Sequence, residues 1–313
     1  RCVKETDLDG GLFLYALAPA TGETRHSYNF DGPRYEEGEK RGRGFEMEGS
    51  KSGLLSTDGK NIYLFANIFS LDLKREAYKP PDRNGQIPQG LHVITTGGFT
   101  DDHAWNRNFW TYSRRWPGFY FANQAPKSGQ LLVVDESTTY AIKQYTTRNA
   151  LSPMFFPDTD GYLLFADDNE NEPSLYGEES AAKPVAWLPD LPDHAKTRRN
   201  GRLDTRSFNN DKKAGYTRTK PTKWQVWVPV RVRAMVRTGD SLFVAGPPDI
   251  LKEGDELAAF RGRAGGKLLT VDAETGTVIN ELDLESPPVF DGLIAAQRHL
   301  YMCTHNGMVL CFR

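Results

Sequence analysis

The sequence contains the same two-strand pattern twice, once near each end. Residues 10–30 read GGLFLYALAPATGETRHSYNF, and residues 265–284 read GGKLLTVDAETGTVINELDL. Each copy starts with two glycines, continues as an alternating apolar run, turns at a Thr-Gly hinge and runs back. Alternation with a period of two predicts paired strands, and the hinge glycine supplies the positive φ that reverses the chain. The repeat therefore favours a fold built from recurring antiparallel units.

Short alternating runs fill much of the remaining chain, and helical patterns are scarce. The clearest runs are residues 61–66, 130–135, 138–144, 162–166, 224–233, 241–245, 300–304 and 308–312. Short helices are predicted only near 252–261 and 178–182. A doubly wound α/β fold needs a crossover helix between parallel strands, so it is excluded. The sequence predicts an all-β protein.

The spacing of the two copies favours a β-propeller among all-β folds. Gly276 follows Gly22 by 254 residues, which is about five or six steps of the 40 to 50 residues typical of a blade. We expect about five to seven four-stranded antiparallel blades in one domain over 1–313, or the C-terminal part of a longer propeller. The ring is expected to be incomplete or closed by pairing of the chain ends. Residues 97–129 and 167–223 are predicted to be long inserts.

The repeats resemble the PQQ-like β-propeller family, the quinoprotein alcohol dehydrogenase-like superfamily. The hinge of such blades reads Ala-x-Asp-x-x-Thr-Gly, and Val271–Gly276 (VDAETG) fits, whereas Leu17–Gly22 (LAPATG) has Ala18 at the Asp position. The segments 231–249, 288–292, 306–312 and 101–110 are similar to large secreted bacterial members without a defined activity. This resemblance implies a periplasmic or extracellular location.

The family's dehydrogenases use PQQ and calcium, with an Asp base and, in many members, two adjacent cysteines. This chain has three cysteines, none of them adjacent to another, and no Cys-x-x-Cys-His haem motif. No cofactor is therefore predicted, and PQQ with calcium is kept as the alternative.

One ligand-binding cluster is predicted in the first insert. Asp101, Asp102, His103, Trp105, Arg107 and Trp110 place carboxylates, an imidazole, a guanidinium and two indoles within ten positions. Such a set could bind a sugar or an anion, or support acid–base catalysis. The alternative is a loop whose aromatic side chains pack on the blade below.

The second insert carries two charged tracts. Asp167, Asp168 and Asn169 offer hard oxygen ligands of the kind calcium prefers, although the spacing of a calcium loop is absent. Residues 196–223 hold ten Lys or Arg against two Asp. Within this run, Arg198, Arg199, Arg202 and Arg206 are candidates for binding an acidic partner. Solvated loops are the alternative for both tracts.

The C-terminal hairpin gives a specific register prediction. A type I′ turn at Asn306-Gly307 would place Cys303 opposite Leu310 and Cys311 opposite Met302. The two sulfurs would then lie on opposite faces of the sheet, which disfavours a Cys303–Cys311 disulfide.

Composition and motifs favour a binding module over an enzyme. The net charge of −2 gives no general attraction to nucleic acid, and no apolar run is long enough to span a membrane. We expect a non-catalytic extracytoplasmic propeller whose partner is a protein, a glycan or an upstream part of the same polypeptide. The alternative is a quinone-dependent oxidoreductase or a polysaccharide-active enzyme that uses the 101–110 loop.

Overall fold

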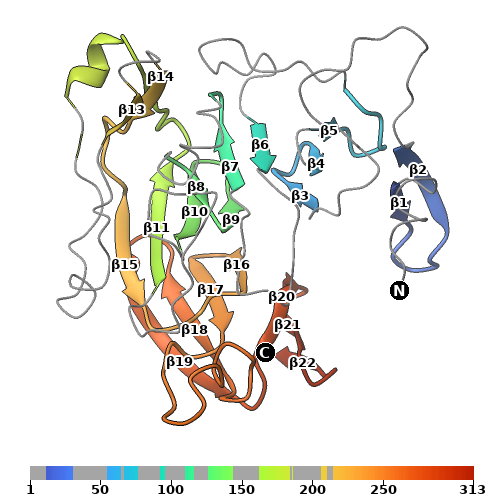
Figure 1. Cartoon of the computed structure of the whole chain (residues 1–313). Helices are drawn as coiled ribbons and strands as arrows, with labels where there is room; N and C mark the ends of the chain where they lie inside the picture. Colours follow the sequence, from blue (N-terminus) through green and yellow to red (C-terminus); the bar gives the residue numbers. More distant parts are fainter. Residues whose placement is uncertain are drawn as a thin grey trace, which may run out of the picture. The chain divides into compact units, whose positions relative to one another are not determined.

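The chain folds into antiparallel sheets with almost no helix (Figure 1). The computed structural model describes residues 12–30, 55–64, 67–76, 92–95, 110–115, 126–143, 162–183, 185, 206–209 and 214–313. Within them the one helical element is the 3-10 helix η3 (Glu179–Ala182), and no helix is long and apolar enough to cross a membrane. The predicted all-β class is confirmed, and the predicted helix at 252–261 is wrong because those described residues form turns and a bridge.

The chain divides into two compact units. The first comprises residues 1–78 and 97–99, and the second comprises residues 79–96 and 100–313. That the whole chain forms one propeller domain stays a prediction.

The first unit contains a hairpin and a three-stranded sheet. Its strands are β1 (Leu12–Leu17), β2 (Thr24–Phe30), β3 (Leu55–Thr57), β4 (Ile62–Leu64) and β5 (Asn67–Phe69). Leu14 of β1 joins Leu64 and Phe69 in one buried cluster, and the Tyr28 ring meets the Phe69 ring edge-on at 5.0 Å. The hairpin is thus attached to the sheet by apolar packing.

The described residues of the second unit form five sheets, four of which follow one another along the chain. The first has β6 (His92–Thr95), β7 (Trp110–Ser113) and β8 (Ser128–Gly129), and the next has β9 (Leu131–Val134), β10 (Thr138–Lys143), β11 (Tyr162–Asp168) and β15 (Trp224–Val228). Then come β16 (Ala234–Thr238), β17 (Ser241–Gly246), β18 (Gly266–Asp272) and β19 (Val278–Leu284), and finally β20 (Pro288–Ala296), β21 (His299–Thr304) and β22 (Val309–Phe312). In each of these four sheets the strands pair in chain order, which makes every sheet a meander.

A fifth sheet lies within the predicted 167–223 insert. It pairs β12 (Ser174–Leu175), β14 (Ala214–Thr217) and β13 (Arg206–Asn209), in that order. The alternating pattern used for sequence prediction is too short in these strands to be recognised. The same holds for β7 and β8, which lie in the predicted 97–129 insert.

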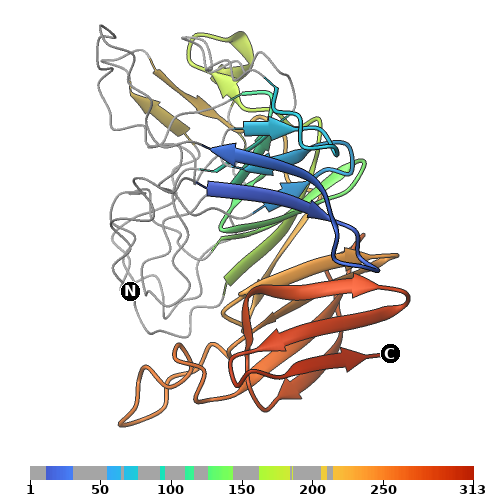
Figure 2. The ribbon, with the colours of Figure 1, turned by 90° about the vertical axis from the view of Figure 1, so that its right-hand side faces the viewer.

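The β16–β19 sheet has a hydrophobic core on each of its faces. Leu242, Val244, Leu269 and Val271 pack toward the β9–β10–β11–β15 sheet. Their neighbours in sequence, Phe243, Ala245 and Leu268, pack toward the β20–β22 sheet, which lies beside it in Figure 2. A further cluster of Ala141, Leu163 and Phe165 covers the other face of the β9–β10–β11–β15 sheet. The first strands β9, β16 and β20 also contact one another in succession. These sheets therefore form a series, in which inner sheets are buried on both faces.

The repeat predicted from the sequence is confirmed in its local structure. Leu17 pairs with Thr24 in the first copy, and Val271 pairs with Val278 in the second, each just after a bulge. Gly22 has φ 73° and Gly276 has φ 75°. The Asp272 carboxylate accepts hydrogen bonds from the backbone and hydroxyl of Thr275, and these bonds lower the pKa of Asp272. Ala18 lacks this cap in the first copy, but the reversal is the same.

The surroundings of the two hinges differ. A Cβ added to Gly276 would lie 2.5 Å from the Trp224 ring, whereas one added to Gly22 would meet nothing within 4 Å. The Trp224 indole nitrogen also donates to the Ala273 carbonyl at 2.9 Å. The second hinge is therefore locked onto β15 of the neighbouring sheet.

The predicted register of the C-terminal hairpin is wrong by one residue. Met302 pairs with Leu310, and Cys303 pairs with Val309, around a three-residue turn in which Gly307 has φ 80°. This register places Met302 and Leu310 on the same face, where both pack in the core against the β16–β19 sheet. As a result Cys303 and Cys311 share the opposite, exposed face of the sheet as free thiols.

Asp291 lies in a bulge of β20 and is exposed. Its φ is 54°, and its backbone N–H donates to the Arg233 carbonyl, which ties the bulge to the segment before β16.

Candidate functional site

The structure describes only part of the predicted ligand cluster and of the basic run. Trp110 begins β7 and is buried, while Asp101, Asp102, His103, Trp105 and Arg107 lie outside the described residues. Arg198, Arg199 and Arg202 also lie outside them, and Arg206 begins β13. Ligand binding by these two groups stays a prediction.

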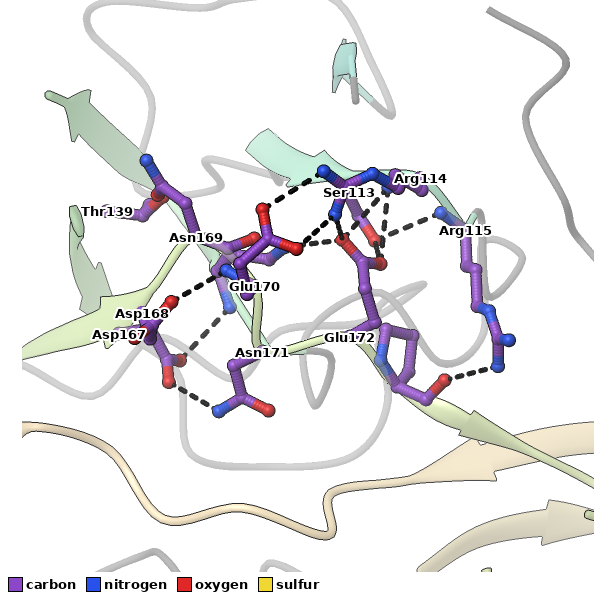
Figure 3. A network of polar contacts seen from close by, with 12 residues as sticks. Ser113, Arg114, Arg115, Thr139, Asp167, Asp168, Asn169, Glu170, Asn171 and Glu172 are labelled. Carbon is purple, nitrogen blue, oxygen red and sulfur yellow. Dashed lines mark hydrogen bonds and ion pairs between the residues drawn. The ribbon is translucent and has the colours of Figure 1, made fainter. Parts of the chain in front are cut away.

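The acidic tract 167–172 is described in full, at the end of β11 and in the turn that follows (Figure 3). β11 is an inner strand, paired with β10 on one side and β15 on the other. Asp167, Asn169 and Asn171 of the tract are buried, whereas Asp168 and Glu170 are exposed. Three adjoining segments surround it: the end of β7, the start of β8 and the segment after β14.

Asp167 forms a fully buried ion pair with Arg218. The Arg218 Nη2 lies 2.6 Å from Asp167 Oδ2, and its Nη1 lies 2.8 Å from Asp167 Oδ1. Neither side chain is exposed to solvent. The Asn171 amide and the Lys127 backbone N–H also donate to this carboxylate, at 2.8 and 3.2 Å. Such a two-pronged pair with extra donors is the geometry that allows a charge to remain inside a protein.

Glu172 connects the tract to the β6–β7–β8 sheet. Its carboxylate accepts the Ser113 hydroxyl, the Arg114 backbone N–H and the ammonium of Lys127, the last at 2.6 Å. Lys127 is fully buried and also donates to the Asn169 carbonyl at 2.7 Å. Burial lowers the pKa of Lys127, and the adjacent Glu172 carboxylate opposes that shift.

The outer part of the tract is held by arginines. Arg114 donates both terminal nitrogens to Glu170, at 2.9 and 3.0 Å, and this pairing lowers the pKa of Glu170. Arg115 binds the Pro173 carbonyl and the Glu178 carboxylate, each at 2.9 Å. Figure 3 shows both arginines extending from the end of β7 toward the tract.

The Asn169 amide and the Asp168 carboxylate complete the network. Asn169 accepts the Thr139 hydroxyl at 2.7 Å and donates to the Asp135 carbonyl at 2.8 Å. Asp168 caps its own turn by accepting the Glu170 backbone N–H at 2.8 Å. Taken together, charged hydrogen bonds link the tract to the end of β7, to Lys127 just before β8 and to the segment after β14, and a neutral bond from Thr139 links it to β10.

The predicted metal ligands are therefore already engaged in protein contacts. Within the described ranges, no group of three or more His, Cys, Asp or Glu side chains is placed to hold a metal ion. Calcium would have to displace Arg218 from Asp167 to use that carboxylate.

Calcium binding at the tract stays a prediction that one titration can test. If the tract binds calcium, the melting temperature should rise with added Ca²⁺, because a ligand specific to the folded state stabilises it. The rise should disappear in Asp168→Asn and persist in Asp240→Asn, an exposed aspartate in the β16–β17 turn. An unchanged melting temperature in the wild type would count against the site.

The acidic and basic tracts are far apart in the sequence, but they are in contact in the structure. Arg218 belongs to the basic run, for which the sequence leaves an acidic partner or a solvated loop open, yet it is buried against Asp167. Lys223, at the end of that run, donates to the Thr138 hydroxyl at 2.6 Å. The opposite charges of the two tracts, four carboxylates in 167–172 and an excess of eight cations in 196–223, were the signal that could have connected them. Nothing in the sequence around Lys127, by contrast, indicates burial.

Comparisons with known proteins give little beyond the fold class. No family model matches the sequence, and no curated protein matches it. Nineteen chains of solved structures match, among them the crystal structure of BamB from Moraxella catarrhalis. That match has a TM-score of 0.36 and 13% sequence identity, and covers 96% of this chain and 78% of that chain. A likeness this loose defines neither the arrangement of the sheets nor an activity. The class shown for this chain is an all-β protein of antiparallel sheets.

Proposed function

We propose that the chain is an extracytoplasmic β-propeller that binds a protein or glycan and performs no catalysis. The observation that carries the proposal is the series of meanders in the second unit. The β16–β19 sheet and the β9–β10–β11–β15 sheet each have apolar cores on both faces. A two-layer sandwich would leave the outer face of each sheet in water, whereas radial blades bury both faces of every sheet.

The contacts between first strands support the same arrangement. In a propeller the first strand of each blade lies nearest the axis, so the first strands of successive blades come together. Here β9 contacts β16, and β16 contacts β20. The outer strand β19 lies at the far edge of its sheet and is almost entirely exposed.

The acidic tract fits a supporting role in such a scaffold. Asp167, Glu170 and Glu172 each bind a cationic side chain from another segment. These pairs fix the turn after β11 and the sheet beyond it. Rigid sheets that hold long connections in place are the common basis of loop-mediated binding.

A binding role makes the exposed edge of the propeller a contact surface. Ile279 of β19 is 60% exposed. We expect a photo-crosslinking amino acid at this position, in the cells that produce the chain, to capture a specific protein partner, and the same amino acid at Thr21 to capture none. A glycan array probed with the purified chain tests the glycan alternative.

The competing enzymatic function is tested by adding PQQ together with calcium. A specific rise in melting temperature, with neither a protein adduct nor a bound glycan, would contradict the proposed function.

A further inference from the structure

A groove opens between the β16–β19 sheet and the β20–β22 sheet. Its volume is about 620 Å³, which is within the usual range of ligand sites. Apolar side chains from both sheets line it: Phe243, Leu268, Leu282, Leu300 and Phe312. The groove continues the core between these two sheets out to the surface, so it offers an apolar floor that is already formed.

The turn between β20 and β21 forms one end of the groove and has a costly conformation. Ala296 pairs with His299, which leaves Gln297 and Arg298 as a two-residue turn with φ 50° and 64°. Asn-Gly is the usual choice for such a turn, because left-handed backbone is unfavourable for most other residues. His299 Nδ1 supports the turn by donating to the Gln297 carbonyl at 2.8 Å. The turn places Gln297, Arg298 and His299 in the groove lining.

The charged residues in the lining are all basic. Arg298, His299 and Arg313 line the groove, and none of the described residues that line it is Asp or Glu. Neither arginine forms an ion pair with any residue that the structure describes, and both are exposed. An anionic group entering the groove would therefore meet two available guanidinium groups without displacing a carboxylate.

The edge strand β19 forms another wall. Asn280 and Leu282 of β19 line the groove, and among the described strands β19 pairs only with β18. Its second edge therefore has backbone donors and acceptors open to another strand. An extended peptide can add to such an edge, with every second side chain pointing toward the same face.

We propose that this groove binds an extended peptide with an apolar residue and an acidic residue two positions apart. The peptide backbone pairs with β19, the apolar side chain packs against Leu282, and the carboxylate binds Arg298 and Arg313. This inference rests on the proposed protein-binding function and assigns a chemistry to the partner.

Fluorescence anisotropy with the full chain tests the peptide directly. The probe is a fluorescein-labelled blocked heptapeptide, TVTLTET, whose leucine and glutamate are two positions apart. We expect it to bind, and we expect the version with glutamine in place of glutamate to bind about tenfold more weakly, as for a lost charge-assisted hydrogen bond. A version with adjacent leucine and glutamate, TVTTLET, should weaken similarly, because the two side chains then point to opposite faces.

Variants of the chain locate the binding. The double variant Arg298→Gln with Arg313→Gln should weaken binding of TVTLTET by at least about tenfold. Arg261→Gln is the matched control, since Arg261 is exposed and does not line the groove. All these arginines are exposed, so the variants should keep the melting temperature of the wild type.

Three outcomes would overturn the inference. They are absence of binding by TVTLTET, equal binding by its glutamine version, and unchanged binding by the double variant. If sodium decanoate bound through Arg298 and Arg313 while the peptide did not, the ligand would be a small amphiphile and the peptide inference would fail. A protein adduct from the Ile279 crosslink in the absence of peptide binding would leave the proposed function standing and reject only the groove.

Discussion

Asp167→Asn is expected to lower the free energy of unfolding by about 3–5 kcal/mol. The substitution keeps the shape of the side chain but removes the carboxylate charge that faces the Arg218 guanidinium in a place closed to water. It also replaces an acceptor oxygen that now binds Asn171 or the Lys127 backbone. Chemical denaturation of the purified variant and the wild type measures the difference.

Two further variants test whether the loss of stability in Asp167→Asn arises from the burial of the ion pair. Glu170→Gln breaks the exposed pair with Arg114 and should cost less than about 1 kcal/mol, because water screens that pair. The double variant Asp167→Leu with Arg218→Met should lose less stability than the sum of its single variants, since it removes both members of the ion pair together. Equal losses for Asp167→Asn and Glu170→Gln would contradict the prediction.

Gly276→Ala is expected to destabilise the second unit by about 2–5 kcal/mol. The left-handed backbone at φ 75° contributes roughly 1–2 kcal/mol, and overpacking contributes about 1–3 kcal/mol more. The overpacking arises because the new methyl group would lie 2.5 Å from the Trp224 ring. Denaturation followed by tryptophan fluorescence should report both the loss of stability and a changed environment of Trp224.

The chain itself supplies the controls for this substitution. Gly239 has φ 55° in the same unit, and Gly22 has φ 73° in the other copy of the repeat; an added Cβ meets nothing within 4 Å at either position. Alanine at either position should lower the free energy of unfolding only by the cost of its left-handed backbone. Combining Gly276→Ala with Trp224→Ala should recover the overpacking part. If alanine were equally costly at positions 276 and 239, the hinge would not be locked against Trp224.

Local sequence patterns predicted the strands and hinges well because their causes are local. The alternation in residues 12–17 and 266–272 and the Thr-Gly reversal predicted the class and the pairing of the strands on either side of each hinge. The C-terminal hairpin shows the limit of this reasoning. A two-residue turn suits Asn306-Gly307, but it would separate Met302 and Leu310 onto different faces. Burial of both side chains against a neighbouring sheet overrides the turn preference and shifts the register by one residue.

The candidate site was less predictable because its contacts are distant in sequence. Asp167 and Arg218 are separated by 51 positions, and Ser113 and Glu172 by 59. Each charge alone looks like a solvated surface residue. Only the meeting of β7, β11 and the segment after β14 converts these charges into buried pairs. The groove was likewise invisible in the sequence, since it arises where two separate sheets diverge.

The serial packing of the sheets has a consequence for how the second unit unravels. Because apolar packing joins each sheet mainly to the one before and the one after it, unfolding resembles the fraying of a stack. The β9–β10–β11–β15 and β16–β19 sheets are the interior layers of that stack and are expected to separate last. The β20–β22 sheet can detach on its own, and its departure would dismantle the groove while leaving the Asp167–Arg218 pair intact.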